Sequence, residues 1–183
     1  MKVSYNWLKD YLDINKPVDE VAEILTNLGL EVEKVEDFES IKGSLEGIVV
    51  GEVLSCKKHP NADRLKLTNI DLGKEGQYEI VCGAPNISKG QKVPVATVGS
   101  VIYTNSGEKI KISKSKIRGV VSNGMVCAED EIGLGDSHDG IMVLDKKIKS
   151  GTPLNEIYKI EKDKILEIGL TPNRSDAMSH YGV

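Results

Sequence analysis

Residues 48–82 carry the pattern that decides the fold: IVVGEVLSCKKHPNADRLKLTNIDLGKEGQYEIVC. Runs rich in apolar and β-branched residues occupy 48–55, 65–72 and 78–82, and segments with Pro, Asn and Gly separate them. Runs of this length, broken by turn residues, are typical of short strands. The glycine-containing segment 73–77 between the last two runs predicts a hairpin turn.

Similar short runs continue along the chain. They cover 93–98, 110–112, 125–127 and 141–144. Many short strands at this spacing favour a small barrel or sandwich. We therefore expect residues 41–151 to form one β-rich domain.

The flanks have a different character. Residues 1–40 are expected to form two helices and a strand, with Ser4 placed to cap the first helix. Residues 152–183 add a short helix, an alternating strand and a turn that leads into a helix near Ser175. We expect 1–40 and 152–183 to form one discontinuous α/β domain, incomplete at its C-terminus, interrupted by the inserted domain 41–151. The fold class is then α+β.

The charge divides along the same boundaries. The whole chain has a net charge of −4, which counts against a generic nucleic-acid binder. Residues 41–151 hold 16 Lys and Arg against 13 Asp and Glu, a balance of +3, whereas the flanks hold 8 against 15, a balance of −7. The insert could therefore meet a polyanion, and the flanks are more suited to a protein partner.

Two classes of location are disfavoured. The chain contains no run of about 18 apolar residues, so no membrane partner is expected. Its first residues lack the apolar stretch of a secretory signal. We expect a cytoplasmic protein.

Motifs for catalysis and metal binding are missing from the sequence. The widely spaced Cys56, Cys82 and Cys127 form no CxxC pair and are expected to be small buried hydrophobes. Neither a phosphate loop nor an HExxH or GxSxG motif occurs. His59, Cys82 and Asp63 could assemble as a nucleophile site, but only their residue types suggest it, and His59 fits a solvent-facing loop. We assign no catalytic and no metal residues.

The first of two basic segments in the insert, residues 57–66 (KKHPNADRLK), joins its first two strands. In OB folds this loop borders the ligand face. Its candidate contacts are Lys57, Lys58, Asn61, Arg64 and Lys66.

The second basic segment, residues 109–118 (KIKISKSKIR), has five cations and no anion. Alternation along a strand would place Lys109, Lys111 and Ser113 on one face, and this stripe could follow a phosphate backbone. The same lysines would also suit a solvated strand edge that avoids pairing with other chains. Its candidate contacts are Lys114, Lys116 and Arg118, and the turn residue Asn123 follows it.

Aromatic residues indicate which kind of nucleic acid could be bound. One Phe, one Trp and six Tyr are too few for a platform that stacks successive bases. Recognition would depend on phosphates, sugars and shape, which suits a folded RNA. DNA is not expected as a partner.

Three segments resemble a known family. Residues 59–65 (HPNADRL), 81–86 (VCGAPN) and 116–128 (KIRGVVSNGMVCA) are similar in order and spacing to the signature blocks of the tRNA-binding OB domain. That domain occurs in phenylalanyl-tRNA synthetase β subunits, many methionyl-tRNA synthetases and stand-alone tRNA-binding proteins. The resemblance implies a five-stranded OB-fold β-barrel. Gly119 and Gly124 allow backbone shapes that other residues resist, so we expect Ser122 and Asn123 to point outward between them. Related domains often carry Ser where this chain has Ala128.

The segments before and after the insert resemble only one of these families. Residues 1–12 and 28–33 resemble the start of bacterial phenylalanyl-tRNA synthetase β chains, and 171–179 (TPNRSDAMS) resembles the segment after their OB insertion. The resemblance implies a subunit of an α2β2 ligase that uses ATP and Mg²⁺ to attach phenylalanine to its tRNA. It places aminoacylation in the α subunit, and editing and Mg²⁺ binding in β domains beyond this region. Two alternatives stay open: a protein-docking scaffold within the synthetase, and a stand-alone tRNA-binding module.

Overall fold

The computed structural model describes residues 1–105 and 107–183, and they form two compact units. The terminal unit comprises residues 1–40 and 161–183, and the barrel unit comprises residues 41–160. The second boundary follows residue 160 instead of residue 151. The reason is that Leu154, in the short helix α3 (Leu154–Ile157), is fully buried in an apolar cluster of the barrel unit.

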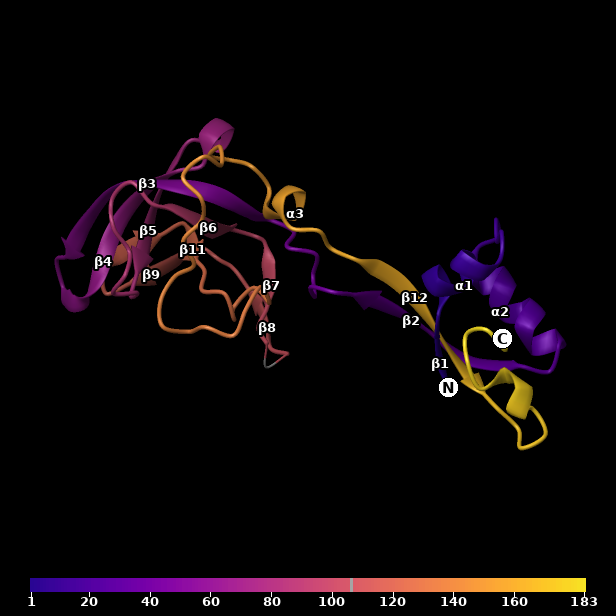
Figure 1. The fold of residues 1–183 in the computed structure, drawn as a ribbon. Helices are drawn as coiled ribbons and strands as arrows, with labels where there is room; N and C mark the ends of the chain where they lie inside the picture. Colours follow the sequence, from indigo (N-terminus) through magenta and orange to yellow (C-terminus); the bar gives the residue numbers. More distant parts are fainter. Residues whose placement is uncertain (106) are drawn as a thin grey trace. The chain divides into compact units, whose positions relative to one another are not determined.

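The terminal unit is a three-stranded antiparallel sheet with two helices (Figure 1). Its strand order is β1 (Lys2–Ser4), β12 (Lys162–Gly169), β2 (Glu31–Glu39), and its helices are α1 (Tyr5–Tyr11) and α2 (Val18–Asn27). Ser4 caps α1 as expected: its Oγ accepts the Trp7 N–H at 3.0 Å. Strand β1 was not predicted, because three residues are too few for a readable alternation.

The end of the terminal unit differs from expectation. The helix predicted near Ser175 is a single 3₁₀ turn, η2 (Ser175–Ala177). Ala177 is nevertheless fully buried in the apolar cluster formed around Leu166 and Ile168 of β12. This last segment therefore contributes to the core of the unit through Ala177 and through the partly buried Val183.

The barrel unit contains a five-stranded antiparallel sheet in the order β11-β6-β3-β4-β5. Its strands are β3 (Ile48–His59), β4 (Ala62–Asp71), β5 (Gln77–Cys82), β6 (Lys92–Thr97) and β11 (Gly124–Val126). The fold class and the five-stranded OB-like barrel are thus confirmed. The predicted hairpin turn at 73–77 is also present, and a 3₁₀ turn, η1 (Gly73–Glu75), lies within it.

The sheet closes into a barrel where β5 meets the segment that precedes β11. The Asn123 N–H donates to the Glu79 carbonyl at 2.9 Å. The Ser122 Oγ accepts the Val81 N–H at 3.1 Å and donates to the Gly124 carbonyl at 3.0 Å. Ser122 is 1% exposed, so the prediction that it points outward is wrong. A buried N–H on the edge of β5 required a partner, and this hydroxyl supplies it.

A glycine in β3 leaves room for the side chains that pack inside the barrel. A Cβ atom at Gly51 would lie 2.5 Å from Ile70 Cγ2 and 2.9 Å from Val95 Cγ2. No side chain fits there without moving the core. The residues packed inside the barrel include Val53, Ile70, Ile80, Val93 and Val95.

Two small ribbons complete the barrel unit. They are β7 (Val101–Tyr103) paired with β8 (Lys109–Lys111), and β9 (Ser115–Ile117) paired with β10 (Val120–Ser122). Residues 141–144 are not a strand, contrary to prediction. The Asn86 carboxamide donates to the Ile141 carbonyl at 2.8 Å and accepts its N–H at 3.0 Å, and Leu144 forms an isolated bridge with Lys92.

Among the described residues, no helix has the length and apolar character needed to cross a membrane.

Replacing Ser122 with Ala should destabilise the barrel. The change leaves the buried Val81 N–H without its acceptor, which costs about 1–3 kcal/mol in the free energy of unfolding. Native-state amide exchange of the barrel strands, and of Val81 in particular, measures this. Ser115→Ala is the matched control, because Ser115 faces Ser122 in the β9–β10 ribbon but is exposed. Equal stability of the two variants would contradict the closing role of Ser122.

Candidate nucleic-acid interface

The first basic segment is a strand hairpin with a tight turn. Strand β3 continues to His59 and β4 begins at Ala62, so only Pro60 and Asn61 lie outside the strands. The strands thus extend further into this segment than predicted. Lys57, Lys58 and Arg64 are exposed on the hairpin, close to its turn.

The second basic segment ends in a two-residue hairpin turn between β9 and β10. Arg118 and Gly119 connect the paired residues Ile117 and Val120, and both have positive φ angles, 48° and 97°. Two successive positive φ angles in a two-residue loop are the mark of a type I′ turn, in which glycine is favoured. Lys116 and Arg118 are exposed on this ribbon, and the exposed Lys114 immediately precedes it.

The two turns are joined by hydrogen bonds. His59 Nε2 lies 3.2 Å from the Ile117 carbonyl oxygen, and its Nδ1 accepts the Asn61 N–H at 3.1 Å. The Asn61 Nδ2 donates to the Arg118 carbonyl at 3.1 Å. His59 is 5% exposed, so the expectation of a solvent-facing histidine is wrong. These contacts bring two basic segments, about 50 residues apart in sequence, together at one place.

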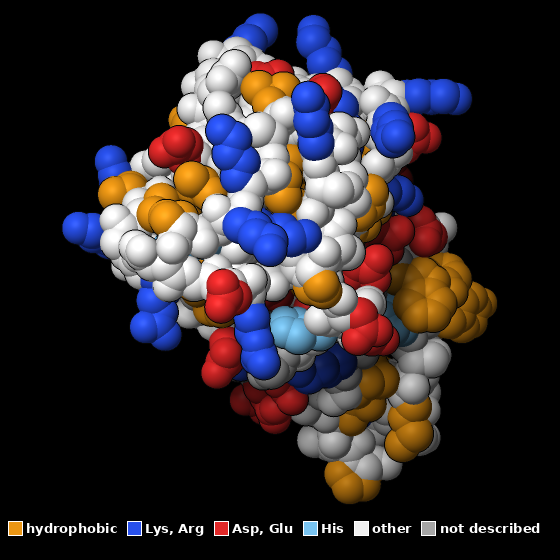
Figure 2. Space-filling view, turned by 90° about the vertical axis from the view of Figure 1, so that its left-hand side faces the viewer, with side chains coloured by type: hydrophobic (Ala, Val, Ile, Leu, Met, Phe, Trp, Pro, Cys, Tyr) orange, Lys and Arg blue, Asp and Glu red, His pale blue; other side chains and the backbone are white. Residues whose placement is uncertain are grey.

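Six of the predicted contacts are cations that are free to meet an anion. Lys and Arg side chains gather over the face of the barrel unit that Figure 2 presents. Within residues 1–105 and 107–183, none of the six forms an ion pair or a side-chain hydrogen bond. They are Lys57, Lys58, Arg64, Lys114, Lys116 and Arg118. Unpaired cations lose no existing ion pair when a phosphate binds.

The remaining predicted contacts also bond within the protein. The Lys66 ammonium donates to the Pro85 and Ile87 carbonyls at 2.8 and 2.9 Å, which fixes the loop after β5. Asn123 contacts the Glu79 carbonyl through both its backbone N–H and its side-chain Nδ2. Asn61 joins the two turns as described above. These three residues hold in place the turns and loops next to the six cations.

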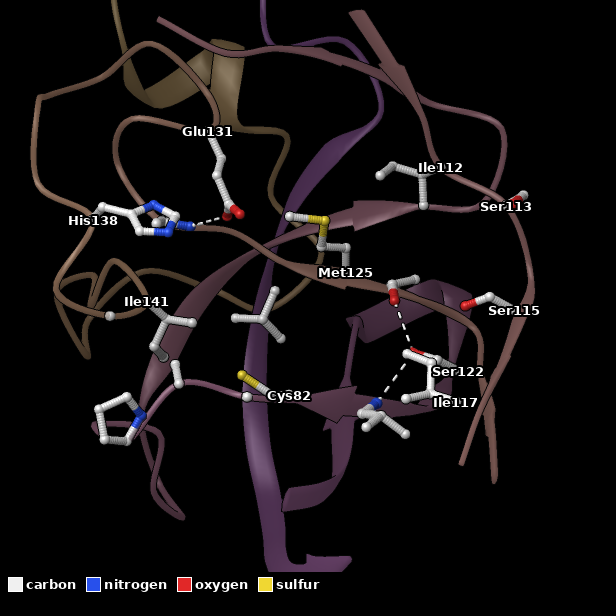
Figure 3. Close-up of a pocket in the computed structure, with 18 of the residues that line it drawn as sticks. Cys82, Ile112, Ser113, Ser115, Ile117, Ser122, Met125, Glu131, His138 and Ile141 are labelled. Atoms are coloured by element: carbon white, nitrogen blue, oxygen red, sulfur yellow. Dashed lines mark hydrogen bonds between the residues drawn. The ribbon is translucent and has the colours of Figure 1, made fainter. Parts of the chain in front are cut away.

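A groove of about 620 Å³ opens beside the second basic segment. Met125 and Cys82 lie between its two walls, with Ser113 and Ser115 on one side and Glu131 on the other (Figure 3). Lys111 also lines it. This groove was not predicted, because its lining residues come from segments far apart in the chain, although many of them lie in the signature segments 81–86 and 116–128.

The acidic wall of the groove is held in place by its own hydrogen bonds. Glu131 Oε2 accepts the Ala128 N–H at 2.7 Å. His138, also in this wall, lies against Asp130 with Nδ1 2.9 Å from Oδ2. The hydrogen bond and charge of Asp130 raise the pKa of His138. The wall formed by residues 128–141 is therefore ordered and carries negative charge.

The geometry does not favour a nucleophile site at His59 and Cys82. Both ring nitrogens of His59 are engaged with backbone groups. Burial raises the pKa of the Cys82 thiol, which disfavours the reactive thiolate. Burial raises the pKa of the fully buried Cys127 as well. The three cysteines are free thiols.

The fold and the surface define a small barrel domain with a cationic edge, the class of OB-fold nucleic-acid-binding domains. Residues 48–153 match the family model described as "Putative tRNA binding domain", and the chain belongs to this family.

The similarity to full-length proteins extends over the whole chain and confirms the resemblance to phenylalanyl-tRNA synthetase β subunits. The chain is 54% identical over 183 residues to the phenylalanine–tRNA ligase beta subunit of Bacteroides fragilis. It is 50% identical over 183 residues to that of Porphyromonas gingivalis. In both comparisons the whole chain is covered, but it spans only 22% of the relative's length. Among solved structures, a MetRS related protein from Pyrococcus horikoshii has a TM-score of 0.41 and 19% identity, covering 57% of this chain and 85% of that one.

Replacing His59 with Ala should loosen the contact between the two turns. The Ile117 carbonyl and the Asn61 N–H each lose a partner, so we expect a loss of about 1–3 kcal/mol in unfolding free energy. Amide exchange should speed up at residues 61 and 117–120, as NMR would show. His138→Ala is the control, because that histidine is exposed. An unchanged exchange rate at both turns would mean that His59 does not hold them together.

Proposed function

We propose that this chain is a tRNA-binding region of a phenylalanine–tRNA ligase β subunit, which holds phenylalanine tRNA for aminoacylation elsewhere in the enzyme. The observation that carries the proposal is a set of six exposed, unpaired cations: five lie on two hairpins whose turns are joined at His59 and Asn61, and Lys114 directly precedes the second hairpin. Because the RNA would be gripped mainly through phosphates, binding should follow backbone shape more than base sequence.

The rest of the enzyme follows from the family to which the relatives belong. We propose that the complete β subunit joins an α subunit in an α2β2 assembly in the cytoplasm. The assembly would use ATP and Mg²⁺ to attach phenylalanine to the tRNA. In this proposal the present residues contribute RNA contacts and supply no group to the chemical step.

Binding of tRNA should depend strongly on salt. If about four phosphates are engaged, the logarithm of the association constant should fall with the logarithm of salt concentration at a slope of about −3 to −4. A titration of labelled tRNA at several salt concentrations measures this slope. A flat salt response would contradict phosphate binding by this surface.

Reversing three charges on the second basic segment should weaken tRNA binding. We expect the Lys114→Glu, Lys116→Glu, Arg118→Glu variant to lose about 10-fold or more in affinity near 0.1 M salt. The three cations no longer neutralise phosphates and release their counterions, and the new carboxylates repel the phosphates. The measurement is the same tRNA titration.

A matched control is available at the other end of the barrel. Three exposed lysines lie there: Lys146, Lys147 and Lys149. Replacing all three with Glu changes the net charge by the same amount as the variant of the second basic segment. Their loop lies beside Gly73, at the end of β4 opposite the β3–β4 turn: a Cβ at Gly73 would be 2.5 Å from the Ser150 carbonyl. Strand β4 has 10 residues, so the two clusters are separated by about 30 Å. Equal losses in both variants would show that only net charge matters.

A second role, docking onto the rest of the synthetase, is favoured by the terminal unit. This unit has a groove of about 550 Å³ between α1 and α2, and Leu12, Ile24 and Leu28 along it are 60%, 39% and 68% exposed. Large exposed apolar groups that gather in a groove are typical of protein contacts. The lining is mostly apolar, with Asp13 and Lys16 of opposite charge, so an apolar surface of another subunit suits it, and we propose the α subunit.

Replacing Leu28 with Glu should weaken that assembly. In the full-length β subunit, a charge at this position would oppose burial of the groove, and we expect assembly with the α subunit to fall several-fold. Analytical ultracentrifugation of the mixed subunits measures it. Val143→Glu, an exposed apolar position in the barrel unit, is the control. Normal assembly of the Leu28 variant would exclude this groove as the contact.

A further inference from the structure

We propose that the groove beside β9 holds one unpaired nucleobase of the bound RNA, with a preference for guanine set by Glu131. This inference rests on the proposed function, because it names a second kind of contact with the same ligand. The groove of about 620 Å³ is within the range of small-molecule sites and exceeds what a single base requires.

The groove has two electrostatically different sides. Lys111, Ser113 and Ser115 lie on the side of the second basic segment. Glu131, His138 and Asp139 lie on the other, and Asp130 binds His138 there. A phosphate is attracted to the first side and repelled by the carboxylates of the second. This charge difference favours one orientation of a nucleotide, with its phosphate near Lys111 and its base toward Glu131.

The middle of the groove suits the flat face of a base. Figure 3 shows Met125 between the hydroxyl side and Glu131, with Ile141 and Cys82 also bordering the space. The polarisable thioether of methionine makes favourable contacts with aromatic rings. Apolar groups around the ring with a few placed polar groups at its edge are the usual composition of a small-molecule site.

Glu131 selects among the bases through its hydrogen-bonding capacity. One carboxylate oxygen already accepts the Ala128 N–H, which fixes the group in the wall and leaves acceptor sites for a ligand. A carboxylate only accepts, so it favours a base edge that presents adjacent donors. Guanine offers its N1–H and N2–H₂ side by side. Adenine and cytosine offer one amino group next to an acceptor, and uracil offers one N–H between two carbonyls that the carboxylate repels.

The test uses the methyl group of Met125 as a probe inside the groove. The chain has four methionines, so methyl-labelled protein gives few signals, and Met1 and Met178 in the terminal unit serve as internal references. GMP, AMP, CMP, UMP and inorganic phosphate would be titrated separately. We expect a ring-current shift of the Met125 methyl that saturates with GMP at about 10-fold lower concentration than with UMP, and no such shift with phosphate.

Two variants address specificity and access. Glu131→Gln keeps an oxygen for the Ala128 N–H but adds donors, so the preference for GMP over UMP should vanish. Ser113→Trp fills the groove from an exposed position and should abolish the Met125 shift. Ser88→Trp, exposed outside the groove, should leave it intact. Retained GMP preference in Glu131→Gln would overturn the role of that residue.

Failure of this inference can be told apart from failure of tRNA binding. If tRNA binds the wild-type chain but no nucleotide shifts the Met125 methyl signal, the groove is not a base site. The proposal that the cations bind phosphates would be unaffected. The same conclusion follows if phosphate alone reproduces the shift. If tRNA itself does not bind, the proposed function fails first.

Discussion

The hydrogen bonds of residues 122–124 against β5 are the contact on which the barrel unit depends. An open five-stranded sheet would leave unpaired backbone groups along β5 and β11. The Asn123 N–H on Glu79 and the Ser122 hydroxyl on Val81 satisfy that edge, and the same hydroxyl donates to the Gly124 carbonyl. At 1% exposure, Ser122 leaves no room for water to substitute. Closure therefore depends on the Asn123 backbone N–H together with one buried hydroxyl that has two partners.

This closure also places the functional surface. Ser122 is the last residue of β10, so fixing it against β5 fixes the β9–β10 ribbon and its turn. The turn then meets the β3–β4 turn through His59 and Asn61. The groove lies along the same ribbon, between Ser115 and the wall that carries Glu131. The cationic edge and the groove are two consequences of one arrangement of β9 and β10.

Most of the barrel strands could be predicted from the sequence, because their runs of apolar and β-branched residues have a local preference for strand structure. It failed where tertiary contacts override that preference. The apolar run 141–144 is no strand: the Asn86 side chain binds the Ile141 backbone, and Leu144 forms an isolated bridge with Lys92. Lys66 has the same residue type as Lys58, yet its pairing with Cys82 brings its ammonium to two carbonyls of the following loop. Neither outcome can be read from residue type, since each depends on a partner 19 or more positions away.

The signature segments are explained in part by these same contacts. His59, Asn86 and Ser122, one in each segment, all use their side chains to bind backbone groups of distant parts of the barrel. Such residues cannot be exchanged without leaving a buried donor or acceptor unpaired. The exposed cations are under no such constraint, since a phosphate accepts Lys or Arg from several nearby positions. The segments that reveal the family therefore combine residues that build the barrel with exposed cations such as Arg64, Lys116 and Arg118. The residues that would touch RNA have to be told apart from the others by exposure and by the absence of internal partners.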